Sequence, residues 1–294
     1  MSFLNYLING LSLGSVYAII ALGYTMVYGI AKMLNFAHGD IIMVGSYIVY
    51  SAMSMAGMHP AIAILIAMVG CMVLGVVTER VAYRPLRGAS SSLAVLITAI
   101  GVSYLLQNIA LLVFGADTKA FTSVINWKGI TLFDGELQIR GTTIITIAVG
   151  LLVLFGLQAF IHRTKSGQAM LAVAQDRGAA TLCGIDVNKT IAITFAIGSS
   201  LAAVAGVLFC STYPTITPYI GSMPGIKAFV AAVFGGIGSI PGAMIGGLTL
   251  GVIEILSRTY ISSQLSEAIV FAILIVVLLV KPTGLLGKRV MEKV

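Results

Sequence analysis

Residues 93–114 read LAVLITAIGVSYLLQNIALLVF, a run without a single charged side chain. A helix needs about 20 consecutive apolar residues to cross the hydrocarbon core of a bilayer. This run therefore predicts a transmembrane helix, and the same pattern recurs along the chain. The other apolar runs cover residues 4–30, 41–57, 61–78, 142–161, 190–211, 226–238, 241–256 and 267–280.

The composition agrees with this pattern. Of the 294 residues, 59% are hydrophobic and only 9% are charged, and the mean hydropathy is +1.05. A soluble globular protein carries about 25% charged residues, so soluble and disordered classes are excluded. We expect an all-α, polytopic helical membrane protein that forms one transmembrane domain over residues 1–294. About eight or nine transmembrane helices are expected, and one of these, at 226–238, is too short for a full span and is short or broken.

The basic residues indicate which loops are cytoplasmic. They give a net charge of +7, and they gather in a few short segments, as the positive-inside rule predicts. Membrane topology therefore explains the net positive charge better than nucleic-acid binding does. The loop at 115–141 is mixed in charge and contains Trp127, so we expect it outside. The basic segments are the loop 79–92 (Arg80, Arg84, Arg87), the loop 162–189 (Arg163, Lys165, Arg177, Lys189) and the C-terminus (Lys281, Lys288, Arg289, Lys293).

Enzyme signatures are not found in the sequence. The glycines at 235–242 lack the Gly-Lys-Ser/Thr ending of a P-loop, and there is no Gly-x-Ser-x-Gly elbow. The histidines, acids and three cysteines have no metal-ligand spacing. We therefore predict no catalytic residue, no bound metal and no cofactor on this chain. Lys227, Glu254 and Glu267 lie near the ends of apolar runs, and we expect them to be snorkelling or capping charges.

The loop 162–189 has the pattern of two short helices. Ser166 is placed to cap a first helix that runs to about Gln175, and Asp176 to cap a second. The second helix would end at Gly184, where a left-handed turn favours glycine. Two alanine-rich helices would make a compact cytoplasmic knob, although a plain solvated connecting loop has a similar composition.

This loop resembles an element of the permease subunits of ATP-binding-cassette importers. Residues 178–184 read GAATLCG and match the Ala-Ala-x-x-x-Gly core of the Glu-Ala-Ala loop, with Gly178 in place of Glu. The Ile-x-Leu-Pro that often follows is missing. Three further segments are similar to the high-affinity branched-chain amino-acid permease family: LNFAHGD at 34–40, AFVAAVFGGIGSIPGA at 228–243, and KPTGLLG at 281–287. The resemblance covers nearly the whole chain.

The resemblance implies a multi-pass permease of the bacterial inner (cytoplasmic) membrane. Its implied partners are a second, larger permease (LivM-like), two ATPase subunits that bind ATP and Mg, and a periplasmic substrate-binding protein. Transport would proceed by alternating access, and the loop 162–189 would couple it to the ATPases. The residues implied in ATPase docking are Arg163, Lys165, Asp176, Arg177, Ala179, Ala180 and Gly184.

Two interrupted segments are candidates for the translocation path or its gate. The first contributes Asn35, His38 and Asp40, although Asp40 could equally be an N-cap and Asn35 a C-cap. The second consists of glycines and a proline that could expose backbone to the path or simply allow close helix packing. The residues of the second segment are Gly235, Gly236, Gly238 and Pro241.

Alternative functions stay open at this point. Within the family, an importer of urea or short amides has similar motifs. Outside it, a stand-alone secondary transporter or channel is disfavoured because the sequence shows no ionisable residue deep inside an apolar run. An intramembrane enzyme is the weakest alternative, since no pair of aspartates lies within the apolar runs.

Overall fold

The computed structural model describes residues 2–88, 92–132 and 137–287. Lys288, Arg289 and Lys293, the basic residues expected at a cytoplasmic C-terminus, lie outside these ranges. Within them, each of the nine apolar runs forms a helix. These helices are α1 (Ser2–Ala31), α2 (His38–Tyr50), α3 (Pro60–Thr78), α4 (Ser92–Phe114), α5 (Gly141–Arg163), α8 (Val187–Thr212), α9 (Ser222–Gly235), α10 (Ile240–Tyr260) and α11 (Ser266–Val280).

The remaining elements are short and lie between these helices. Two helices, α6 (Lys165–Gln175) and α7 (Arg177–Leu182), occupy the central loop. A π-helical turn, Ser51–Met55, continues α2, and a second, Glu79–Tyr83, continues α3 into the 3-10 turn Arg84–Gly88. The strands form two antiparallel pairs. They are β1 (Lys119–Ala120) with β4 (Thr215–Ile216), and β2 (Ile130–Leu132) with β3 (Leu137–Ile139).

Six helices of the described chain are long and apolar enough to cross a membrane: α1, α3, α4, α5, α8 and α10. The polytopic all-α architecture is therefore confirmed. The structure contains two shorter apolar helices rather than one, because α9 and α11 have only 14 and 15 residues. At 1.5 Å per residue, each covers about 20 Å, which is less than the thickness of about 30 Å of the hydrocarbon core.

The helices are arranged around a buried centre. The apolar window of α1 is 89% buried and that of α8 is 72% buried, whereas those of α3, α4 and α5 are 28% buried or less. The outward faces of these three helices carry exposed apolar side chains such as Leu65, Ile97 and Leu152. Water would not tolerate so large an apolar surface, so these faces are the surface that contacts lipid.

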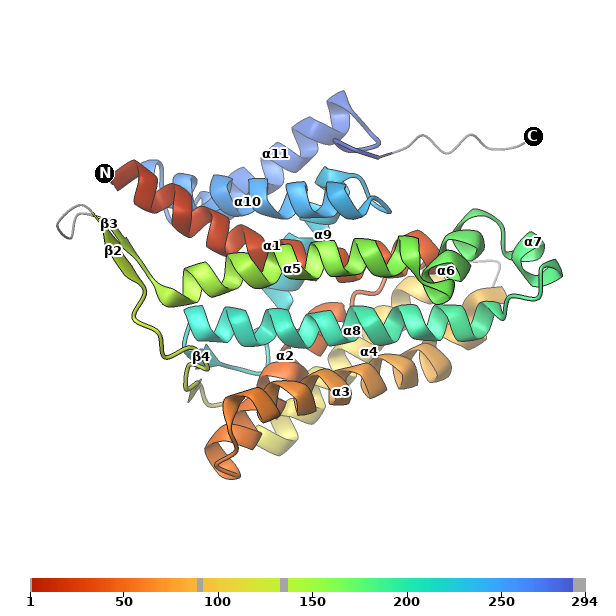
Figure 1. Cartoon of the computed structure of the whole chain (residues 1–294), viewed down its shortest axis with the longest axis horizontal. Helices are drawn as coiled ribbons and strands as arrows, with labels where there is room; N and C mark the ends of the chain where they lie inside the picture. The colour runs from red at the N-terminus through yellow and green to blue at the C-terminus, as the bar shows by residue number, and fades with distance from the viewer. Residues whose placement is uncertain (1, 89–91, 133–136, 288–294) are drawn as a thin grey trace.

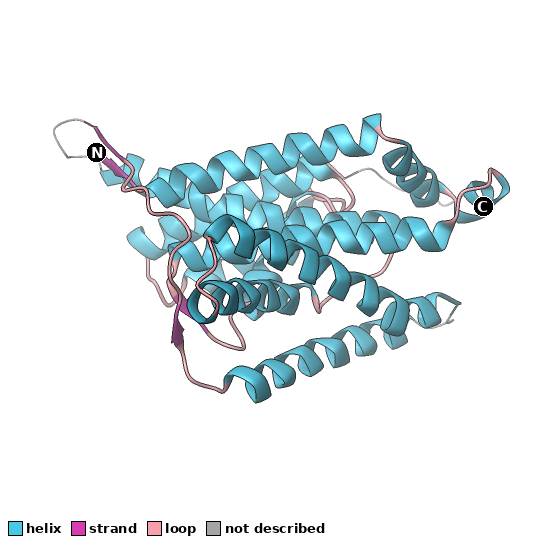
Figure 2. Cartoon of the chain, turned by 60° about the horizontal axis from the view of Figure 1, so that its bottom comes forward, coloured by secondary structure: helices cyan, strands magenta, loops and turns pink. Residues whose placement is uncertain are grey.

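The two ends of the bundle differ. Figure 1 shows the start of α1 and the strands β2, β3 and β4 at one end, and α6 and α7 at the other; β1 pairs with β4. The rotated view in Figure 2 shows the same separation, with the strands at the end where the N-terminus lies. The strands that follow α4 and the helices α6 and α7 therefore lie at opposite ends of the long helices.

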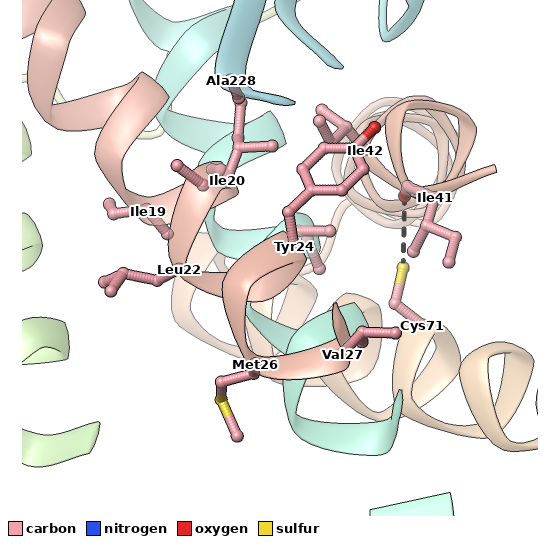
Figure 3. Packing of buried hydrophobic residues seen from close by; sticks show 14 of the residues in the cluster. Ile19, Ile20, Leu22, Tyr24, Met26, Val27, Ile41, Ile42, Cys71 and Ala228 are labelled. Atoms are coloured by element: carbon pink, nitrogen blue, oxygen red, sulfur yellow. Dashed lines mark hydrogen bonds between the residues drawn. The ribbon is translucent and has the colours of Figure 1, made fainter. Parts of the chain in front are cut away.

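Small residues allow the central helices to approach closely. At Gly14 of α1, an added Cβ would lie 2.7 Å from the Cα of Leu248 in α10, and at Gly10 it would lie 2.8 Å from the Cα of Val252. Such contacts replace the hydrophobic driving force that lipid does not supply. Figure 3 shows the adjoining core, where the Cys71 thiol of α3 donates to the Ile41 carbonyl of α2 over 3.6 Å.

A buried charge network fixes the short helix α9. The Glu254 carboxylate of α10 accepts hydrogen bonds from Tyr17 of α1 over 2.9 Å, from Lys227 of α9 over 2.8 Å, and from Arg258. The Lys227 ammonium also contacts Glu267 at the start of α11 over 3.1 Å. Two cations and two carboxylates compensate one another, so the group is neutral as a whole.

The expectation that Lys227 and Glu254 are snorkelling or capping charges is wrong. Their side chains are only 4% and 0% exposed, whereas Glu267, at 47%, does lie in the first turn of α11 near the surface. Burial is tolerated because each charge has a partner on a neighbouring helix. The sequence analysis disfavoured a stand-alone secondary transporter because it found no ionisable residue deep inside an apolar run. That premise is wrong. The charges are buried, but they are paired with each other.

We predict that removing one member of this network destabilises the protein more than removing a matched pair. Glu254→Gln leaves Lys227 buried without its main partner, and Lys227→Met leaves Glu254 with excess negative charge. Each change should cost about 3–5 kcal/mol. The double variant should cost less than the sum of the two, because no unpaired charge stays on α9. Thermal unfolding of the purified protein in detergent measures the three values.

Glu267→Gln is the matched control. Its half-exposed carboxylate should lose about 1 kcal/mol or less, since exposed ion pairs contribute little. Additive effects of the Lys227 and Glu254 substitutions would show that the two side chains do not stabilise one another.

Candidate functional site

The two short helices α6 and α7 form a knob at one end of the bundle. The Thr164 hydroxyl caps α6 by accepting from the Gly167 amide over 3.0 Å. The expected cap, Ser166, lies inside the helix, because α6 begins one residue after Thr164. The Asp176 carboxylate caps α7 by accepting from the Ala179 amide over 2.9 Å. Gly184 ends the knob with a φ of +78°, so these two expectations are confirmed.

The knob is attached to the centre of the bundle. The Arg177 guanidinium, at the first position of α7, donates to the carbonyl of Ala31, the last residue of α1. Gly167 packs against the backbone of Ile161 at the end of α5, where any side chain would collide. The base of the knob is therefore rigidly held, and its tip projects.

The tip presents an apolar residue that the sequence analysis did not single out. Leu182, the last residue of α7, is 91% exposed, beside the exposed Ala179 and Cys183. Ala180 is 3% exposed and packs beneath the tip, so it supports α7 rather than forming its outer surface. Of the other predicted docking residues, Arg177 is half-buried, and the following are exposed: Arg163, Lys165, Asp176 and Gly184.

The three polar residues of the first interrupted segment point to three different neighbours. Asn35 accepts from the Tyr83 hydroxyl over 2.8 Å at the end of α3. The His38 ring packs edge-on against Tyr24, with ring centroids 4.7 Å apart, and lies over Gly23 of α1. Asp40 accepts from the Gln107 amide of α4 over 2.8 Å. The structure therefore does not gather them into one site.

The capping alternatives for two of these residues are wrong. Helix α1 ends at Ala31, and Lys32 follows in a left-handed conformation with φ +54°, so Asn35 caps nothing. The N-cap of α2 is Ala37, which places Asp40 inside the first turn. Its negative charge there is favourable, since the N-terminal end of a helix carries a partial positive charge.

A pocket of about 490 Å³ opens between α2, α4 and α9, next to Asp40. Its polar side is formed by Asp40, Gln107, Ser103 and Ser222, and the Gln107 amide lies 3.4 Å from Ser103 and 3.5 Å from Ser222. This volume falls within the range of small-molecule sites, about 300–1,000 Å³. The sequence analysis did not identify Gln107 or Ser222. A single amide in an apolar run forms no motif, and neither does a single serine before a short helix.

The second interrupted segment is a tight turn between α9 and α10. Gly236 and Gly238 have φ values of +106° and +93°, which side chains rarely adopt. The Ser239 hydroxyl caps α10 by accepting from the Gly242 amide over 3.2 Å, and Pro241 lies in the first turn. The C-terminal segment covers this turn, since the amides of residues 285 and 286 donate to the carbonyls of Phe234 and Gly235. The geometry accounts for these glycines by turn formation and close packing.

The described residues contain no group of three or more His, Cys, Asp or Glu side chains that could hold a metal ion. Cys71 and Cys210 are buried and apart, and Cys183 is alone at the tip of the knob. What the geometry offers is a polar pocket inside a membrane bundle and a projecting knob at one end.

Comparison with known proteins identifies the family of this chain. A family model described as "Branched-chain amino acid transport system / permease component" matches residues 6–278. The chain is 47% identical to the high-affinity branched-chain amino acid transport system permease protein LivH of Escherichia coli (strain K12), over 99% of this chain and 98% of that protein. It is 45% identical to the corresponding permease protein BraD of Pseudomonas aeruginosa, with the same coverage. The chain belongs to the family of branched-chain amino acid transport system permease components.

Proposed function

We propose that this chain is one of two permease subunits of an ATP-driven importer for branched-chain amino acids in a bacterial inner membrane. The observation that carries the proposal is the match to permeases with this substrate in their names, at nearly half identity over almost the full length. Such an identity favours leucine, isoleucine and valine over urea or short amides. The chain itself would carry no ATPase activity.

The knob formed by α6 and α7 would be the contact with the ATPase subunits. It is held at its base by Arg177 and projects Leu182, which suits insertion into a groove of a partner. An almost fully exposed leucine on a projecting helix is apolar surface that a protein partner can bury. In this arrangement, the end of the bundle with α6 and α7 is cytoplasmic, and the end with the strands and the N-terminus is external.

The partners can be tested by affinity purification of the chain from its native membrane in a mild detergent. We expect mass spectrometry to find a second, larger permease and two copies of the ATPase subunits. A periplasmic binding protein should join the complex when the substrate is added. A homo-oligomer without an ATPase would contradict the proposal and favour a stand-alone transporter.

We predict that Leu182→Ser uncouples the importer without affecting the fold. Because Leu182 is 91% exposed, its loss should leave expression and thermal stability unchanged. Burying a leucine side chain contributes about 1.5–3 kcal/mol, so ATPase binding should weaken tenfold or more. Leucine uptake should fall with it.

Leu152→Ser is the matched control, because Leu152 is also strongly exposed, at 73%, but lies on the outward face of α5. This variant should keep the ATPase subunits. Normal uptake by Leu182→Ser at normal expression would contradict docking through the tip of α7.

We predict that the two ends react with membrane-impermeant maleimide from opposite sides. Cys183 is the only exposed native cysteine among the described residues, so in membranes that contain the chain without its ATPase subunits it should react only from the cytoplasmic side. In a Cys183→Ser background, Lys128→Cys should react only from outside, since Lys128 is exposed in the loop near the strands. Labelling of both sites from the same side would contradict the proposed orientation.

A further inference from the structure

Asp40 is a buried acid without a basic partner among the residues that the structure describes. Three acidic side chains in the described residues are fully buried: Asp40, Glu79 and Glu254. Glu79 pairs with Arg87, and Glu254 pairs with Lys227 and Arg258. Asp40 forms no salt bridge within the described chain, and its side-chain hydrogen-bond partners, the Gln107 amide and the Ser103 hydroxyl, are both neutral. A carboxylate within a membrane bundle is costly, and in such a place it is by default a functional group with a partner to be found.

The pocket beside Asp40 has two chemically different sides. One side has the Asp40 carboxylate, the Gln107 amide and the hydroxyls of Ser103 and Ser222. The rest of the lining is largely apolar and includes Phe36, Leu96, Ile100 and Ile226. A cation alone would be matched by the first side only. A ligand with an ammonium group on a short aliphatic body would match both.

The pocket is placed where two short helices begin. Gly39 of α2 faces the backbone of α9, so that an added Cβ would lie 2.7 Å from the Gly221 carbonyl oxygen. This close approach brings Ser222, at the start of α9, to the same pocket as Asp40. The lining includes Tyr104 of α4 and Tyr219, which are 62% and 54% exposed, so the pocket reaches the surface of the bundle. A polar pocket cannot open into lipid without cost, so the second permease is the partner that would close it.

We infer that this pocket binds the ammonium group of the amino-acid substrate during its passage, with Asp40 as the counter-charge and Gln107 as the residue that positions Asp40. This inference rests on the proposed function, since it identifies where the transported amino acid is held. The hydrocarbon side chain of the substrate would contact the apolar part of the lining. The permease would then recognise the substrate within the membrane, in addition to the selection made by the periplasmic binding protein.

A cysteine in the pocket can report its occupancy. In the assembled importer with Cys183→Ser, Ser103→Cys places a thiol within the pocket, and its rate of modification by a small methanethiosulfonate reagent is measured. We expect leucine and 3-methylbutylamine, which carries the ammonium but no carboxylate, to slow the modification. We expect 4-methylpentanoate, which carries the carboxylate but no ammonium, to leave it unchanged. Protection by sodium or potassium chloride alone would replace the inference with an inorganic cation site.

Asp40→Asn tests the counter-charge with almost no change of shape. Loss of a hydrogen bond between charged groups corresponds to about tenfold or more in binding. Protection by 3-methylbutylamine should therefore disappear, and leucine uptake should fall by a similar factor. Asp117→Asn, an exposed acid in the loop after α4, is the matched control and should retain both. Unchanged protection in Asp40→Asn would overturn the inference.

The outcomes separate this inference from the proposed function. One outcome is that the wild-type importer takes up leucine while neither leucine nor 3-methylbutylamine slows modification of the pocket cysteine. In that case the proposed function holds and the inferred binding site is wrong. If Asp40→Asn instead separates the two permeases without any ligand effect, Asp40 belongs to the contact between them, and the inference fails. If wild type shows no leucine uptake yet 3-methylbutylamine protects, the amine site holds and the proposed substrate is wrong.

Discussion

The buried carboxylate of Glu254 is the interaction on which the interior depends. It accepts from side chains of α1, α9 and α10, and Lys227 extends the network to α11. Helix α9 has 14 residues, or about 21 Å at 1.5 Å per residue, and cannot span the membrane. A lysine on such a helix would be drawn toward water if it had no partner. Pairing Lys227 with Glu254 keeps α9 inside the bundle, and so places its first residue, Ser222, beside α2.

This arrangement makes polar chemistry possible inside an apolar protein. An interrupted backbone at membrane depth is tolerated only where protein surrounds it or where it lines a cavity. Both conditions hold where α2 and α9 begin. Gly39 and Gly221 bring the two backbones together, while Asp40 and Ser222 border the pocket. In other transporters, discontinuous helices serve the same purpose, since helix ends offer partial charges to a substrate without a fixed ion.

Features that depend on a local sequence pattern could be predicted from the sequence. Contacts between residues far apart in the chain could not. Apolar runs predicted all nine helices, and Asp176 and Gly184 marked the ends of α7 because caps act over three residues. The choice of Ser166 over Thr164 failed because both hydroxyls suit a cap, and only the path of the chain after α5 decides between them. Lys227 and Glu254 were misread because their pairing joins two helices. Gln107 was missed because its partner, Asp40, lies 67 positions away.

The knob and the pocket are joined by a short piece of chain. Arg177 at the start of α7 holds the carbonyl of Ala31, where α1 ends. From Ala31 the chain runs through Asn35 into the first turn of α2, which contains Asp40. Asn35 accepts a hydrogen bond from the Tyr83 hydroxyl. If the knob docks as proposed, a displacement of α7 would act on the residues that lead into the pocket, without needing to pass through the packed core. Such a link transmits a change only if its contacts differ between two states. The Arg177–Ala31 and Tyr83–Asn35 contacts are single hydrogen bonds, which can be broken and remade while the helices around them stay packed.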